Sequence, residues 1–155
     1  MNTPGEPTFD ALYRDLILDH YKAPHGRTAL AREDVVTEGM NPICGDEVDV
    51  ALELGPDGRF SGVRVDGRGC AISVASGSIL HDLVVGLTPA EAKQYIAAVK
   101  ASLQGGPMPQ GVDLGDFEAL EGVKQFPVRI KCALLPWTTL DQAMRELDAK
   151  FGGKA

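Results

Sequence analysis

Residues 48–65 read VDVALELGPDGRFSGVRV. The first half alternates apolar and polar side chains, which is the period of a strand with one buried face; its apolar positions are Val48, Val50, Leu52 and Leu54. The segment 55–58 holds two glycines, a proline and an aspartate, a composition typical of a turn, and apolar residues return after it. We therefore predict an antiparallel hairpin with strands at 48–54 and 59–66.

The segments on both sides of this hairpin are mostly helical in pattern. Before it, residues 10–20 show the spacing of an amphipathic helix, and Val35 and Val36 begin a further strand that ends near Gly39. Thr88, as N-cap, opens the clearest helix after the hairpin. The helices predicted there span 70–85, 88–103, 116–124, 127–132 and 136–150.

These elements predict an α+β fold, with a small antiparallel sheet packed against several helices. The chain has 155 residues, which fits a single domain with a real hydrophobic core, and residues 1–8 are expected to be a loose tail. Trp137 and Phe126 are expected in that core rather than on a recognition surface.

The composition excludes several classes of function. The formal net charge is −7 and there is no basic run, so a nucleic-acid partner is not expected. No apolar run is long enough to cross a membrane, and the N-terminal residues do not form a secretory signal. Three cysteines, an odd number, argue against a disulfide framework. We expect a cytoplasmic protein with free or metal-bound thiols.

The three cysteines each lie in a distinctive local context. Cys44 lies in the proline- and glycine-containing run NPICGD with Asp46 two residues on, and extended chain there would point both side chains the same way. Cys70 follows a glycine-rich turn at a helix start, where backbone N–H groups favour a thiolate. Cys132 precedes Pro136 by four residues, so we expect the helix to break or kink just after it.

Together these residues form a plausible donor set for one metal site. Three thiolates and the carboxylate of Asp46 would complete a tetrahedral zinc site, with Arg129 and Lys131 helping to hold thiolate charge. The spacing of the cysteines matches no local zinc motif, so spacing alone leaves a structural zinc site and buried, non-ligating thiols open. The three histidines are expected to be surface or partly packed residues: His20, His25 and His81.

Several motifs, in order along nearly the whole chain, resemble the IscU/NifU-N class of iron–sulfur assembly proteins, most closely its SufU branch. They are Leu12-Tyr13-Arg14, Asp19-His20-Tyr21-Lys22, Asn41-Pro42-Ile43-Cys44-Gly45-Asp46, Gly69-Cys70-Ala71-Ile72-Ser73-Val74-Ala75-Ser76, and the run from Asp113 through Phe126-Pro127-Val128-Arg129-Ile130-Lys131-Cys132. The resemblance implies a three-stranded antiparallel sheet with helices packed on it and a metal site at one end.

The resemblance also implies what the site does. Zinc would be bound by Cys44, Asp46, Cys70 and Cys132, with Cys44 accepting persulfide sulfur from a SufS-type cysteine desulfurase. Asp46, a hard oxygen ligand among sulfurs, would tune how easily a ligand leaves. The sulfur would then pass to the downstream iron–sulfur assembly machinery.

One alternative within the family is a non-enzymatic scaffold that builds a [2Fe–2S] cluster on the same ligands. Scaffold members carry a histidine immediately before the last cysteine, and this chain has Lys131 there. The segment between the second and third cysteines is also shorter in scaffold members. In this chain the stretch 105–124 makes that segment long. Both departures favour a zinc-dependent sulfurtransferase over the scaffold.

Overall fold

The computed structural model describes residues 9–152, and the side chains of residues 13–151. The tail expected at 1–8 lies outside this range. The elements, in chain order, are α1 (Phe9–Lys22), β1 (Val35–Asn41), β2 (Asp46–Leu54), β3 (Phe60–Arg68), α2 (Ala71–Val84), α3 (Pro89–Gln104), the 3₁₀ helix η1 (Gly115–Gln125), α4 (Pro127–Leu147) and the short π-helical turn η2 (Asp148–Gly152).

The sheet is three-stranded and antiparallel, in the order β1-β2-β3. The predicted hairpin is confirmed, because β2 and β3 are neighbours in register, with Val50 opposite Val65 and Leu52 opposite Val63. Val48, Val50 and Leu52 are fully buried on the covered face of β2, as alternation predicted. The α+β fold class is therefore confirmed.

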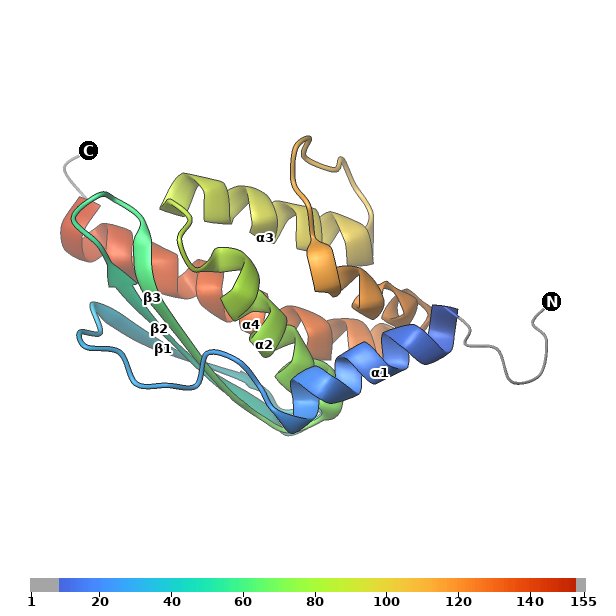
Figure 1. Cartoon of the computed structure of the whole chain (residues 1–155). Coiled ribbons are helices and arrows are strands. Elements are labelled where there is room, and N and C mark those ends of the chain that lie inside the picture. Colours follow the sequence, from blue (N-terminus) through green and yellow to red (C-terminus); the bar gives the residue numbers. More distant parts are fainter. Residues whose placement is uncertain (1–8, 153–155) are drawn as a thin grey trace.

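The helices lie on one side of the sheet (Figure 1). α2 and α4 pack directly on the strands, α1 lies along α2, and α3 packs on α4. The core forms between the sheet and these helices, and Trp137 in α4 is fully buried there, as expected. Phe126 was wrongly assigned to the core, because 57% of it is exposed just before α4 begins.

The prediction of two C-terminal helices, 127–132 and 136–150, is wrong. α4 is one continuous helix of 21 residues with Pro136 inside it. Proline removes only the hydrogen bond to the carbonyl of Cys132, while the apolar face of the helix continues on both sides of it. Gly77 of α2 faces the proline ring, and a Cβ at position 77 would lie at an ordinary contact distance of 3.8 Å from Pro136 Cγ. Packing therefore offsets the local cost of the proline.

A buried polar contact fixes α4 against α2. Ser76 Oγ donates to the carbonyl of Ala133 over 2.6 Å, and Trp137 Nε1 donates to Ser76 Oγ over 3.1 Å. Because these polar atoms are paired with one another, their hydrogen bonds offset the cost of removing them from water. It holds the helix that carries Cys132 against the helix that follows Cys70.

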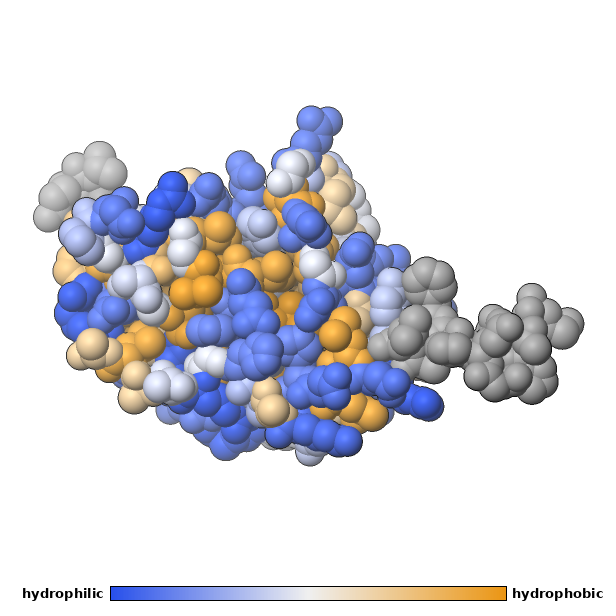
Figure 2. All heavy atoms as spheres, in the orientation of Figure 1, coloured by the Kyte–Doolittle hydropathy of each residue, from blue (hydrophilic) through white to orange (hydrophobic). Residues whose placement is uncertain are grey.

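The surface is mixed in character. Figure 2 shows hydrophilic residues over much of the face seen in Figure 1, with apolar residues gathered near its middle. No helix in the described range 9–152 is long and apolar enough to cross a membrane. Apolar residues exposed on the described surface include Met40, Ile43, Met108, Phe126 and Val128.

Candidate metal centre

Strand pairing brings three of the four predicted site residues to one end of the sheet. Asn41 at the end of β1 pairs with Asp46 at the start of β2, and Glu47 pairs with Arg68 at the end of β3. The same end of the sheet therefore carries the β1–β2 turn, the start of β2 and the junction between β3 and α2. Cys44, Asp46 and Cys70 lie on these three segments.

Cys44 lies on a tight turn, so the extended chain that would have pointed its side chain the same way as that of Asp46 is not present there. Residues 42–45 form the turn between β1 and β2, closed by a 2.8 Å hydrogen bond from Gly45 N–H to the carbonyl of Asn41. Gly45 has φ of 75°, a conformation that glycine adopts at little cost. Asn41 Oδ1 accepts from the N–H of Ile43 over 3.3 Å and orders the turn from within. The turn leaves Cys44 partly exposed.

Asp46 is fully buried and is held by the backbone that precedes α2. Its Oδ1 accepts from the N–H of Cys70 over 2.8 Å, and its Oδ2 lies 3.8 Å from Cys70 Sγ. Gly69 has φ of 131°, and a Cβ on it would come within 2.9 Å of Asp46 Cα and would meet the carboxylate itself. The glycine before Cys70 therefore lets the carboxylate reach the thiol.

Cys132 brings the third thiol from α4. It is buried, and its Sγ lies 3.4 Å from Cys44 Sγ. The ligand atoms of Cys44, Asp46 and Cys132 all lie within 4.8 Å of one another, and Cys70 joins them through its contact with Asp46. The structure thus places all four predicted ligands in one cluster, hereafter the cysteine cluster.

The cysteine cluster combines a thiol of raised pKa with a buried carboxylate. Burial raises the pKa of the Cys132 thiol well above its usual range, and hydrogen bonding with Asp46 and Cys44 raises that pKa further. The neighbouring Cys70 raises it too. No lysine or arginine within the described residues pairs with Asp46. A buried carboxylate without a cation is costly.

A divalent metal ion fits this donor set. Soft thiolates favour zinc or iron, a carboxylate oxygen is a known zinc ligand, and a cation would balance the buried charge. The expectation that Arg129 and Lys131 hold thiolate charge finds no support, because both side chains are exposed and the cysteine thiols of the described residues hydrogen-bond other partners. The metal itself is the group that could supply the positive charge.

Comparison with known proteins identifies the family of this chain. A family model described as the NifU-like N terminal domain matches residues 12–133, a range that includes all four predicted ligands. The chain belongs to this family. The resemblance drawn from the sequence motifs is therefore confirmed.

Relatives of this NifU-like domain cover most of its length. The zinc-dependent sulfurtransferase SufU of Bacillus subtilis is 37% identical over 135 residues, 87% of this chain and 90% of the relative. The iron–sulfur cluster assembly scaffold protein IscU of Streptococcus pyogenes is 35% identical over 86% of this chain and 83% of its own. The crystal structure of FiSufU from Fervidobacterium islandicum superposes with a TM-score of 0.77 at 31% identity, covering 84% and 94% of the two chains.

The histidines of this NifU-like domain lie apart from the cysteine cluster. His25 is exposed and His81 is partly buried, as expected, but the prediction for His20 is wrong because only 4% of it is exposed. His20 is buried because Ser78 and Asp116, 58 and 96 residues away in sequence, bond its two ring nitrogens. Sequence reasoning missed this grouping, since no local spacing links segments so far apart.

Proposed function

We propose that this chain is a zinc-dependent sulfurtransferase in iron–sulfur cluster assembly, which accepts sulfur on Cys44 from a SufS-type cysteine desulfurase. The observation that carries the proposal is a partly exposed thiol, Cys44, 3.4 Å from the buried thiol of Cys132. It lies beside the buried carboxylate of Asp46, which no cation of the described residues pairs with. A relative 37% identical to this chain is named a zinc-dependent sulfurtransferase, and Lys131 replaces the histidine expected of scaffold members.

Cys44, Asp46, Cys70 and Cys132 would hold the zinc. When bound, zinc would keep the coordinating thiols deprotonated at neutral pH. Cys70 and Cys132 are tied to helices and Asp46 lies in β2, so these three are rigid anchors. Cys44 lies on a four-residue turn with an exposed neighbour, which makes it the thiol that can leave the cluster to react.

The transfer step then follows thiol–disulfide exchange chemistry. The thiolate of Cys44 attacks the outer sulfur of the persulfide on the desulfurase and forms a new S–S bond. The S–S bond on the desulfurase breaks, and its cysteine leaves as a thiolate. Cys44 now carries the persulfide, and no net oxidation or reduction occurs. Passing the outer sulfur to the next thiol repeats the same exchange.

The surface beside Cys44 suits a protein partner. Ile43 is 69% exposed directly next to the reactive thiol, and Phe126 and Val128 are each more than half exposed at the start of the helix that carries Cys132. Exposed apolar side chains in one region indicate an interaction surface. We propose that the desulfurase docks over these residues, with its persulfide facing Cys44.

An activity assay tests the transfer. Alanine formation by a cysteine desulfurase supplied with cysteine should rise when the zinc-loaded chain is added. Cys44→Ala should remove that stimulation, because the acceptor thiol is gone, while its melting should stay cooperative. Full stimulation by Cys44→Ala, or none by the wild-type chain, would rule out sulfur acceptance on Cys44.

The docking surface needs a separate measurement. Ile43→Ala should raise the desulfurase concentration needed for half-maximal stimulation without changing the metal content. Met108→Ala is the control, because Met108 is another exposed apolar side chain but lies in the loop between α3 and η1. Equal effects of the two variants would place the docking surface elsewhere.

A second candidate function is a scaffold that assembles a [2Fe–2S] cluster on the same four residues. Its support is the 35% identity to a relative named as a scaffold, together with a donor set of three thiols and a carboxylate that could also hold a cluster. Anaerobic incubation with iron and sulfide, followed by transfer to an apo-ferredoxin, distinguishes the two. A colourless protein that keeps about one zinc per chain favours the sulfurtransferase.

We also propose that the chain works as one domain in the cytoplasm. One hydrophobic core extends from Val48 in β2 to Leu147 at the end of α4, so the described elements share a single interior. The net charge of −7 disfavours a nucleic-acid partner. Limited proteolysis that yields one resistant fragment spanning both β2 and α4 is the result expected of one domain.

A further inference from the structure

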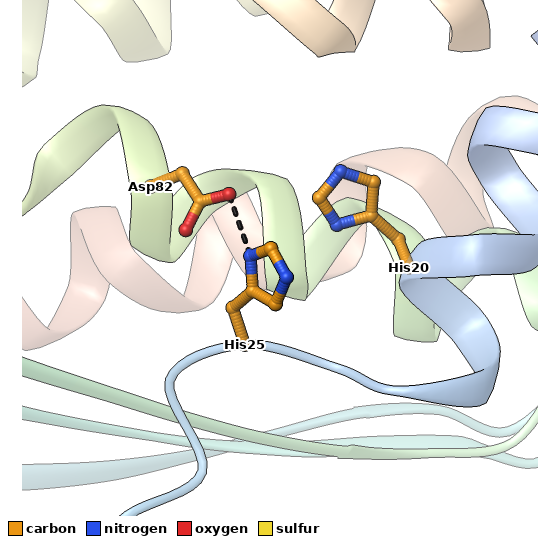
Figure 3. Close-up of side chains that lie close together, drawn as sticks. All are labelled: His20, His25 and Asp82. Atoms are coloured by element: carbon orange, nitrogen blue, oxygen red, sulfur yellow. Dashed lines mark hydrogen bonds and ion pairs between the residues drawn. The ribbon is translucent and has the colours of Figure 1, made fainter.

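A second group of metal-ligand side chains lies on the helical side of the molecule. His20 of α1, His25 of the α1–β1 loop and Asp82 of α2 converge from three segments, as Figure 3 shows. A ring nitrogen of each histidine and a carboxylate oxygen of Asp82 all lie within 4.8 Å of one another. The two imidazole rings are 4.9 Å apart. We call this group the histidine cluster.

His20 is held in one orientation by its hydrogen bonds. Its Nε2 lies 2.9 Å from Asp116 Oδ2, a hydrogen bond in which the ring N–H donates to the carboxylate. Ser78 Oγ accepts from the N–H of His25 over 2.8 Å, so its hydroxyl is free to donate to His20 Nδ1, 2.6 Å away. A carboxylate on the far nitrogen is the arrangement that orients metal-binding histidines and raises their basicity.

We propose that His20, His25 and Asp82 form a second binding site for a divalent transition-metal ion of the zinc class. Two imidazole nitrogens and one carboxylate oxygen are a ligand set that zinc accepts, with a fourth position left open. Asp116 holds His20 in place, and the surface cavity beside it is lined by two carboxylates, Asp19 and Asp116, and one cation, Lys22.

Binding requires only small movements at the exposed side of the cluster. Ligands about 2.0–2.1 Å from a tetrahedral zinc lie about 3.3 Å from one another, closer than the present limit of 4.8 Å. The side chains of His25 and Asp82 are 52% and 43% exposed, so both can rotate toward the fixed ring of His20. His20 Nδ1 must give up its bond to Ser78, and the 2.7 Å hydrogen bond between His25 Nδ1 and Asp82 Oδ2 must also open. Both losses make this site weaker than the cysteine cluster.

The histidine cluster is separate from the cysteine cluster. Cys70 caps α2 and Asp82 lies 12 residues further along, which corresponds to about 18 Å at the helical rise of about 1.5 Å per residue. No residue of one cluster hydrogen-bonds a residue of the other in the described range. A metal at the histidine cluster is therefore independent of the sulfur-accepting thiol.

The test is a metal titration of tag-free chain already loaded with one equivalent of zinc. Isothermal titration with further Zn²⁺ should show a second, weaker equivalent. His25→Ala and Asp82→Asn should each weaken this second equivalent at least tenfold and leave the first unchanged. His81→Gln is the control, because His81 also lies on α2 but bonds the carbonyl of Val63 instead. Its second equivalent should match wild type.

A parallel titration with Co²⁺ identifies the ligand atoms. Cobalt at the histidine cluster should give visible bands without the intense sulfur-to-metal absorption that thiolates produce. Binding of a single equivalent by the wild-type chain would overturn the proposal, and so would a second equivalent that survives in both His25→Ala and Asp82→Asn. Desulfurase stimulation should be unchanged in both variants, so this test is independent of the sulfur-transfer assay.

Discussion

The cysteine cluster and the histidine cluster are both assembled from distant segments, but they differ in how their polar atoms are paired. Buried Asp46 accepts one backbone N–H, contacts a thiol and has no cation among the described residues. Buried His20 has a protein partner on each ring nitrogen. The first cluster therefore holds a buried carboxylate with no cationic partner among the described residues, whereas both ring nitrogens of His20 in the second are already paired.

This difference predicts that metal binding should change the stability of the protein more at the cysteine cluster than at the histidine cluster. An ion at the cysteine cluster would balance a buried charge, so metal binding and folding are coupled there. An ion at the histidine cluster has to replace an existing hydrogen bond to Ser78, so the gain is smaller. The same residue types can therefore form a strong or a weak site, depending on which partners the fold already supplies.

Zinc removal gives the largest expected effect and tests the first half of this contrast. Stripping zinc with a chelator should lower the free energy of unfolding by about 4 kcal/mol, relative to protein with free zinc at about 1000 times its dissociation constant. Far-UV circular dichroism should show that the fold survives, because the core is large enough without the metal. Identical melting curves with and without zinc would contradict the coupling of metal binding and folding at the cysteine cluster.

Gly69→Ala sharpens the contrast at Asp46. A Cβ at position 69 would meet the carboxylate, and φ of 131° is strained for alanine, so we expect a loss of about 1–3 kcal/mol in unfolding free energy. Zinc affinity should fall with it, because Asp46 is displaced. Gly67→Ala is the control, since the nearest atom to its Cβ would be 3.7 Å away. Equal zinc affinity in both variants would contradict the role given to Gly69.

Local patterns in the sequence predicted most of the fold. Alternation in β2 and the turn at 55–58 predicted the hairpin, and the capping box of Thr88 and Glu91 is present at the start of α3. Where the prediction failed, long-range packing had overridden a local rule. Pro136 should have ended a helix, but the face of α4 that packs on α2 at Gly77 carries the helix through.

The candidate site was harder to predict than the fold. Local chemistry marked Cys44, Cys70 and Cys132 as metal ligands, but their proximity follows from strand register and from the contact between α2 and α4. The histidine cluster carried no sequence signal, because the partners of His20 lie 58 and 96 residues away. Only tertiary structure reveals such groupings, since no local period links those positions.

Ser78→Ala tests the second half of the contrast. The variant leaves the buried Nδ1 of His20 and the N–H of His25 without their partner, so we expect a loss of about 1–3 kcal/mol in unfolding free energy. Ser102→Ala is the matched control, because Ser102 is also buried but bonds only the carbonyl of Val99 within its own helix. Urea unfolding should rank Ser78→Ala as clearly more damaging, and the reverse order would show that the histidine cluster is not held by these bonds.

Asp34 offers a buried carboxylate that does have a cation, and so completes the comparison with Asp46. Hydrogen bonding from Arg32 lowers the pKa of Asp34, the N–H of Leu54 lowers it further, and together they outweigh the opposing effect of burial. Asp34→Asn should lower the unfolding free energy by about 1 kcal/mol at pH 7, since the Arg32 side chain is more than half exposed and solvent screens the pair.

The stabilisation that Asp34 provides should depend on pH, and the direction follows from its lowered pKa. Because the folded-state pKa of Asp34 lies below its unfolded value of about 3.9, the stabilisation is fully present above that value and disappears as the pH falls through the folded-state pKa. The difference between wild type and Asp34→Asn in urea unfolding should therefore be constant from pH 7 to about pH 5 and shrink below about pH 4. If the difference in unfolding free energy grew as the pH fell, Arg32 would not stabilise the ionised form of Asp34. Asp34 would then not be an example of a buried carboxylate stabilised by a cation.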